Sequence, residues 1–157
     1  MAPPPGSTCW STTPACCIRA SASARSPPRR STTACTNATG PFLLTQALAP
    51  LLADGARVAN LSSELGSIAG KDAFRTPSYS ISKAALNMAT ALLARALAER
   101  GIVVIALHPG WVQTDMGGAG ADVAPREAAA ALLRVIERAA AGDSGGFFDR
   151  HGVPVRW

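Results

Sequence analysis

Residues 78–110 read SYSISKAALNMATALLARALAERGIVVIALHPG, and this segment carries the clearest structural pattern in the chain. Its first part carries apolar residues at helical spacing, which predicts a long helix over Ser78–Arg100. The unbroken apolar run Ile102–Leu107 comes next, and such a run is typical of a strand buried on both faces of a parallel sheet. A long amphipathic helix leading into a buried strand indicates an α/β fold.

The alternation of helix and strand continues on both sides of this stretch. Upstream, the pattern predicts a helix over Pro41–Ala53 and a short strand over Arg57–Ser62. Downstream, it predicts a helix from Pro125 to Ala141 and a short extended piece that starts at Gly145. This order predicts an α/β doubly wound parallel sheet, with its active site beyond the carboxyl ends of the strands.

Composition limits the classes of function. A chain of 157 residues with a hydrophobic fraction of 48% fits one domain with a buried core, and no run of eighteen apolar residues predicts a transmembrane helix. Residues 1–36 hold four arginines and no acid, so they supply most of the net charge of +5. The rest of the chain is nearly neutral, so we expect no nucleic-acid partner. We also expect a cytoplasmic protein without a membrane partner.

The first 36 residues differ from the rest, because they contain all four cysteines and no Leu, Val, Phe or Tyr. Their Arg- and Ser-rich, acid-free composition is that of a transit peptide, although the prolines argue against an amphipathic helix. A disulfide or metal framework is a second interpretation. The cysteine spacing fits no zinc pattern, and the rest of the chain has an intracellular character; the residues concerned are Cys9, Cys16, Cys17 and Cys35.

A frameshifted translation is the third interpretation of this segment, and the favoured one. Back-translation of Gly6–Ile18 with mostly G/C-ending codons, read from the third base, gives an apolar strand that ends in Asn-Asn-Ala-Gly. The same procedure turns Arg25–Cys35 into a helix-like stretch. We therefore expect residues 1–36 to be an aberrant, disordered segment and residues 37–157 to form a domain that lacks the first strands of its sheet.

Several polar motifs fall where the predicted elements meet. Tyr79 and Lys83 are spaced i, i+4 near a helix start, so they project from one face, and an ammonium beside a phenol favours the phenolate. Such a phenol can give a proton to a carbonyl oxygen or take one from an alcohol near neutral pH. Ser62 and Ser63 close a strand, where a hydroxyl can bind a developing oxyanion. Taken singly, the first pair is ordinarily a solvated helix face and the second a turn.

Two more motifs complete the set. Asn37 opens a helix in the sequence NATG, a place where asparagine is ordinarily an N-cap. The sequence HPGWVQTD over His108–Asp115 follows the buried strand, where Pro and Gly turn the chain sharply. In order and approximate separation, the motifs NATG, SSELG, YSISK and HPGWVQTD resemble the short-chain dehydrogenase/reductase family. The resemblance runs from Asn37 to Trp157, and SSELGSIAG and FFDRHGVPVRW are most similar to the C-factor-like (sniffer-type) carbonyl reductases.

The resemblance implies a role for each motif residue. It implies that Tyr79 is the general acid/base and that Lys83 lowers the pKa of Tyr79 and holds the nicotinamide ribose hydroxyls. It also implies that Asn37 maintains a water relay behind Lys83. Ser63 would position the substrate oxygen. Ser62 and Ser67 remain alternatives, because Ser63 lies farther before Tyr79 than is common in the family. The loop over the nicotinamide would consist of Pro109, Gly110, Val112 and Thr114.

The implied activity is hydride transfer between NAD or NADP and a small-molecule carbonyl or alcohol substrate. No metal is implied, and His108 and His151 are interpreted as structural. A homo-oligomer through the long helices is a family-like expectation. The family's G-x-x-x-G-x-G turn, which cradles the pyrophosphate, is absent from the sequence. The alternative is therefore a non-catalytic remnant that is unable to bind the cofactor.

Overall fold

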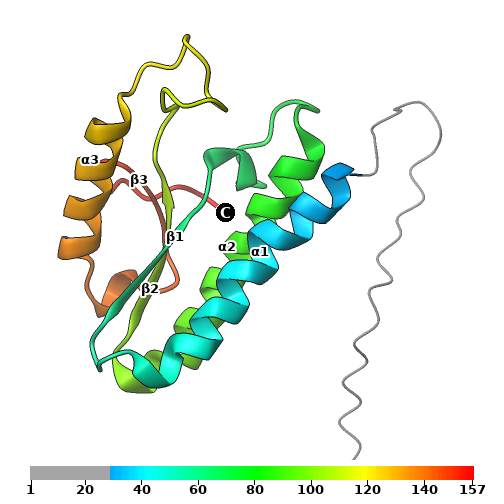
Figure 1. Cartoon of the computed structure of the whole chain (residues 1–157). Coiled ribbons are helices and arrows are strands. Elements are labelled where there is room, and N and C mark those ends of the chain that lie inside the picture. The colour runs from blue at the N-terminus through cyan, green and yellow to red at the C-terminus, as the bar shows by residue number, and fades with distance from the viewer. Residues whose placement is uncertain (1–28) are drawn as a thin grey trace, which may run out of the picture.

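The computed structural model describes residues 29–157, with side chains described from residue 36 onward. The elements in chain order are α1 (Arg29–Leu48), β1 (Arg57–Leu61), α2 (Pro77–Ala96), β2 (Val103–His108), α3 (Pro125–Arg138) and β3 (Phe147–Asp149). The strands of this part of the chain form one parallel sheet in the order β1-β2-β3 (Figure 1). The predicted α/β class is confirmed.

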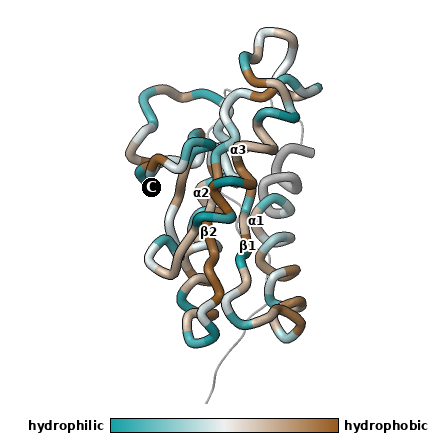
Figure 2. Tube along the Cα trace, turned by 90° about the vertical axis from the view of Figure 1, so that its left-hand side faces the viewer, coloured by the Kyte–Doolittle hydropathy of each residue, from teal (hydrophilic) through white to brown (hydrophobic). Residues whose placement is uncertain are grey.

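The helices cover both faces of the sheet. Helices α1 and α2 lie side by side on one face, and α3 packs on the other (Figure 1). Successive residues of β2 point to opposite faces, so Val104 packs with Leu93 of α2 and with Leu97 just after that helix, while Ile105 packs with Val135 of α3. This two-sided burial explains the hydrophobic colouring along β2 in Figure 2.

Most of the predicted elements are present near their predicted bounds. The expected strand at Arg57–Ser62 is β1, the run at Ile102–Leu107 is β2, and the piece after Gly145 contains β3. Helix α2 ends at Ala96 and a short 3-10 turn continues to Arg100, while α3 ends at Arg138 rather than Ala141.

The expected start of the first helix is wrong. Helix α1 begins at Arg29, so the last part of the segment expected to be disordered is helical, and Pro41 lies inside the helix instead of at its start. Proline removes one helical hydrogen bond, and the packing of α1 along α2 offsets this loss. The expectations for the first three cysteines and for the rest of residues 1–28 lie outside the described residues.

The turn before β1 is fastened to the turn before β2. The guanidinium of Arg100 donates to the backbone carbonyls of Ala49 and Leu52 and forms a 2.8 Å ion pair with Asp54. The amide of Gly55 donates to the carbonyl of Arg100 at 3.0 Å. The Arg100 side chain therefore joins the segments that precede the amino ends of β1 and β2. These ends lie at the edge of the sheet opposite the polar motifs.

No helix within the described range combines the length and the apolar character that crossing a bilayer requires.

Candidate active site

The first turns of α2 carry the tyrosine and lysine that the sequence singled out. Lys83 Nζ donates a 2.7 Å hydrogen bond to the backbone carbonyl of Leu61, the last residue of β1. The same Nζ lies 5.7 Å from the centroid of the Tyr79 ring, as the i, i+4 spacing predicts. Burial lowers the pKa of Lys83 below its ordinary value, because a desolvated ammonium is less stable. The hydrogen bond to Leu61 therefore holds the Lys83 amino group beside the Tyr79 ring, and burial makes this group a weaker base than an exposed lysine.

Gly66 brings the serine motif against α2. A Cβ on Gly66 would lie 2.8 Å from the backbone carbon and from the Cβ of Lys83, so only glycine allows this approach. Gly66 ends a 3-10 turn (Glu64–Gly66) whose N-cap is Ser63. The spacing S-x-x-G thus fixes the serine next to the helix segment that carries Lys83.

The three candidate serines differ in whether their hydroxyl proton is already donated in a hydrogen bond. The Ser62 hydroxyl donates a 2.6 Å hydrogen bond to Asn87 Oδ1, so its proton is committed. Ser63 Oγ accepts from the amide of Leu65, and Ser67 Oγ accepts from the amide of Gly70. Both of these hydroxyls keep a proton to donate, and Ser63 is the nearer of the two in sequence to Leu61, the end of β1 that binds Lys83. We expect the Ser63 and Tyr79 hydroxyls to lie within hydrogen-bond reach or one water of each other, and this stays a prediction, because within the described residues they form no direct hydrogen bond.

Asn37 connects α1 to the same region of α2. Its Nδ2 donates to Ser82 Oγ at 3.4 Å, and that hydroxyl donates to the backbone carbonyl of Tyr79 at 2.7 Å. Pro41 has no amide hydrogen, so the Asn37 carbonyl accepts no helical bond from residue 41. Asn37 lies within α1, so it is not an N-cap. Because Pro41 cannot donate to it, the backbone carbonyl oxygen of Asn37 remains able to accept a hydrogen bond.

The loop after β2 folds back on itself beyond the sheet edge. Gly110 has a φ of +84°, a conformation that favours glycine, and a Cβ there would also meet the Arg150 guanidinium at 2.9 Å. Val112 pairs with Val123 in an isolated bridge. Thr114 Oγ1 accepts from the amide of Gly117 at 3.2 Å. The structure therefore places Pro109, Gly110, Val112 and Thr114 in one ordered loop at the carboxyl end of β2.

His108, interpreted as structural, links this loop to the serine turn. Its Nε2 lies 3.4 Å from Glu64 Oε2, while its buried Nδ1 has no hydrogen-bond partner among the described residues. Burial is the main cause that lowers the pKa of His108. Glu64 and Asp149 oppose this effect, and Arg150 adds to it. No three His, Cys, Asp or Glu side chains gather as a metal-binding group in residues 36–157.

Sequence reasoning missed the role of Asn87. This buried amide accepts from Ser62 and donates to the backbone carbonyl of Gly66 at 3.4 Å, so it fastens both ends of the serine turn to α2. A polar residue on the apolar side of a predicted helix is the signal that could have identified it.

The sheet and its polar edge define the class of protein. A doubly wound parallel sheet with its serine, lysine and tyrosine motifs at the carboxyl edge is a partial Rossmann-like α/β domain. The family model described as enoyl-(acyl carrier protein) reductase matches residues 19–144, so the similarity starts ahead of Asn37.

Comparison with individual proteins agrees with this class. The C-signal protein of Myxococcus xanthus is 44% identical over 123 residues, which cover 77% of this chain and 74% of that protein. The carbonyl reductase Sniffer of D. melanogaster superimposes with a TM-score of 0.81 at 33% identity, over 85% of this chain and 59% of the other. An NADPH-bound carbonyl reductase from chicken fatty liver gives a TM-score of 0.77 at 37% identity, over 84% of this chain and 58% of the other. The chain belongs to the short-chain dehydrogenase/reductase family, and it spans less than two thirds of these reductase structures.

Proposed function

We propose that the described residues form the proton-transfer half of an NAD(P)-dependent oxidoreductase site that acts on carbonyl or alcohol substrates. The observation that carries this proposal is the position of Lys83 Nζ, bonded to the end of β1 and 5.7 Å from the Tyr79 ring centroid. Family membership and the carbonyl reductases among the similar structures support the reaction class.

In the reducing direction, the chain's own residues manage the proton and the developing charge. Tyr79 donates its phenolic proton to the carbonyl oxygen as that oxygen becomes an alcohol. The adjacent Lys83 ammonium stabilises the phenolate that remains. Ser63 donates its free hydroxyl proton to the same oxygen and stabilises the negative charge in the transition state. The carbonyl of Asn37, without its helical partner at residue 41, is suited to accept from a water that returns protons towards Lys83.

The residues present fit one part of a nicotinamide coenzyme. A groove of about 800 Å³ lies between α1 and β1, and Asn37, Leu61 and Lys83 are among the residues that line it. Lys83 would hold the ribose hydroxyls there, and the loop of Pro109, Gly110, Val112 and Thr114 would cover the nicotinamide and phosphates. When bound, the coenzyme supplies or accepts the hydride. NADP or NADPH is present in similar solved structures, which supports NAD(P) as the coenzyme here.

The second candidate function is a non-catalytic remnant. The glycine-rich turn that holds a pyrophosphate does not occur in this sequence, and β1 has no neighbour on its outer edge within the described residues. On this hypothesis the chain keeps the fold of the proton-transfer half without useful affinity for the coenzyme.

Titration of the purified chain with NADPH distinguishes the two candidates. Coenzyme fluorescence and heat of binding report saturation, and oxidation of NADPH in the presence of a carbonyl substrate reports turnover. Saturable binding at micromolar concentration with turnover supports the reductase. Absence of binding up to millimolar NADPH supports the remnant.

A matched pair of serine variants tests the assignment of the oxyanion donor. Ser63 and Ser67 are both buried and each accepts one backbone amide, so loss of either hydroxyl has a similar structural cost. Turnover should fall about 100-fold or more in Ser63→Ala and stay near the parent value in Ser67→Ala. The reverse result would move the role to Ser67.

A homo-oligomer is the partner that we propose for the helical layer. Helices α1 and α2 expose large apolar side chains, among them Leu43, Met88 and Leu92. Light scattering coupled to size-exclusion chromatography would give the mass of the assembly, and a monomer at high concentration would contradict the proposal.

A further inference from the structure

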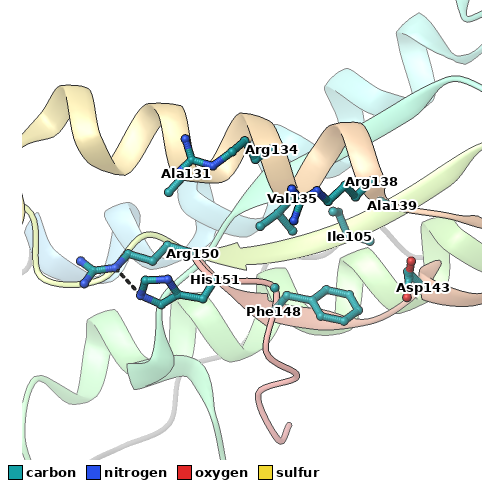
Figure 3. A pocket seen from close by; sticks show the side chains of 11 residues that line it. Ile105, Ala131, Arg134, Val135, Arg138, Ala139, Asp143, Phe148, Arg150 and His151 are labelled. Atoms are coloured by element: carbon teal, nitrogen blue, oxygen red, sulfur yellow. Dashed lines mark hydrogen bonds between the residues drawn. The ribbon is translucent and has the colours of Figure 1, made fainter.

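A second pocket lies on the opposite face of the sheet from α1 and α2. Its volume is about 430 Å³, within the range of small-molecule sites, and it is bounded by α3, β2 and the residues around β3. Figure 3 shows Arg134 and Arg138 on α3 along one side and Arg150 and His151 on the facing segment, with Phe148 near its base. No catalytic motif of the chain contributes a side chain to this pocket.

The polar lining of the pocket is strongly cationic. The side chains of Arg134, Arg138 and Arg150 form no ion pair with any described residue. The one acid in the lining, Asp143, accepts a 2.8 Å hydrogen bond from the backbone amide of Ala140. Arg150 Nε donates to His151 Nε2 at 3.0 Å, so its remaining guanidinium N–H groups stay available (Figure 3).

The two arginines of α3 repel each other in the absence of a bound anion. Arg134 and Arg138 are spaced i, i+4 on α3, an arrangement in which like charges destabilise an isolated helix. The helix dipole favours a cation in the last turn, where Arg138 lies, but it does not explain Arg134 one turn earlier. An anion bound between them would turn this repulsion into two charge-assisted contacts.

The base of the pocket is apolar. Ile105 is 1% exposed, Ala139 is buried, and Val135 and Phe148 are partly buried in the same hydrophobic cluster. A guanidinium rim over an aliphatic and aromatic base matches a ligand that joins an oxyanion to an apolar body.

We propose that this pocket binds an amphipathic organic anion, with a phosphate or carboxylate held by Arg134, Arg138 and Arg150 and an apolar body on Phe148 and Val135. The site is separate from the Tyr79–Lys83 region, so it is a binding activity in addition to the proposed reaction. Planar guanidinium groups bind oxyanions through paired hydrogen bonds, which lysine cannot reproduce.

Calorimetric titration with 1-naphthyl phosphate tests the proposal on the intact chain at low salt. We expect saturable one-to-one binding with a dissociation constant below 1 mM. Inorganic phosphate and 1-naphthol should each bind at least tenfold more weakly, because each lacks one half of the recognised chemistry. Equal binding of inorganic phosphate would overturn the apolar part of the proposal, and no saturable binding of the naphthyl compound would overturn all of it.

A charge-matched set of variants locates the site. Arg134→Gln and Arg138→Gln should each weaken naphthyl phosphate binding about tenfold, whereas Arg126→Gln, on the exposed first turn of α3 outside the pocket, should leave it unchanged. All three remove one charge, so a difference between them reports position. Unfolding midpoints would show that the variants fold. Equal effects in all three variants, or none in the first two, would refute the site, and neither result depends on NADPH binding.

Discussion

The Gly66→Ala variant should unfold at a lower temperature than the parent chain. The added methyl carbon would lie 2.8 Å from two carbons of Lys83 and 3.0 Å from the amide nitrogen of Ala84, whereas non-bonded carbons normally stay about 3.5–4.0 Å apart. These atoms belong to the backbone and first side-chain carbon of α2, so no rotamer change relieves the overlap. Overpacking of this kind costs about 1–3 kcal/mol, which corresponds to about 3–10 °C in the unfolding midpoint of a chain of this size.

Circular dichroism at 222 nm during heating measures this midpoint. Gly142→Ala is the matched control, because a Cβ on Gly142 meets nothing within 4 Å and its φ is not positive. The control should stay within about 0.5 kcal/mol of the parent chain. If Gly66→Ala unfolds at the same temperature as Gly142→Ala, the close contact between the serine turn and α2 is not real, and the placement of Ser63 beside Lys83 loses its main support.

Three further predictions concern the site and its surroundings. If the chain turns over NADPH, Tyr79→Phe should lower turnover about 10²–10⁴-fold and leave coenzyme binding nearly intact, because only the proton donor is lost; full activity would refute the role of Tyr79. Asn87→Ala should lower the free energy of unfolding by about 1–3 kcal/mol in urea titrations, because the buried Ser62 hydroxyl loses its acceptor; an unchanged value would show that Asn87 does not hold the serine turn. Stability should fall as the pH drops below about 6.5, because the lowered pKa of His108 makes the unfolded chain bind the proton first. His108→Gln should reduce that slope, and an unchanged slope would assign the pH dependence to other groups.

Periodicity predicted the three strands and the helices α2 and α3. The apolar run that became β2 is buried on both faces, and its flanking helices carry clear apolar stripes. The start of α1 could not be predicted in this way, because the residues before Pro41 show no apolar repeat and proline normally marks a helix start. Contact with a second helix, through Asn37 and Ser82, is tertiary information that no local window contains.

The candidate site was predicted in part. The i, i+4 rule placed Tyr79 and Lys83 on one face, and the structure agrees. The sequence left Ser62, Ser63 and Ser67 as alternatives, because their spacing to Tyr79 did not decide among them and a local window does not show whether the Ser62 proton is already donated. That depends on Asn87, which lies 25 residues from Ser62 in the chain. The arginines of the second pocket come from α3 and the segment after β3, and only the folded sheet brings them together.

The bonds made by Arg100 have a consequence for how the molecule opens. This side chain and its own carbonyl link the turn before β1 to the turn before β2, across about fifty positions of the chain. Neither turn can fray without breaking contacts of the other, so the two should behave as one cooperative unit in hydrogen exchange. Amides of Gly55 and Val103 should then become accessible to deuterium at similar rates, and Arg100→Ala should separate those rates.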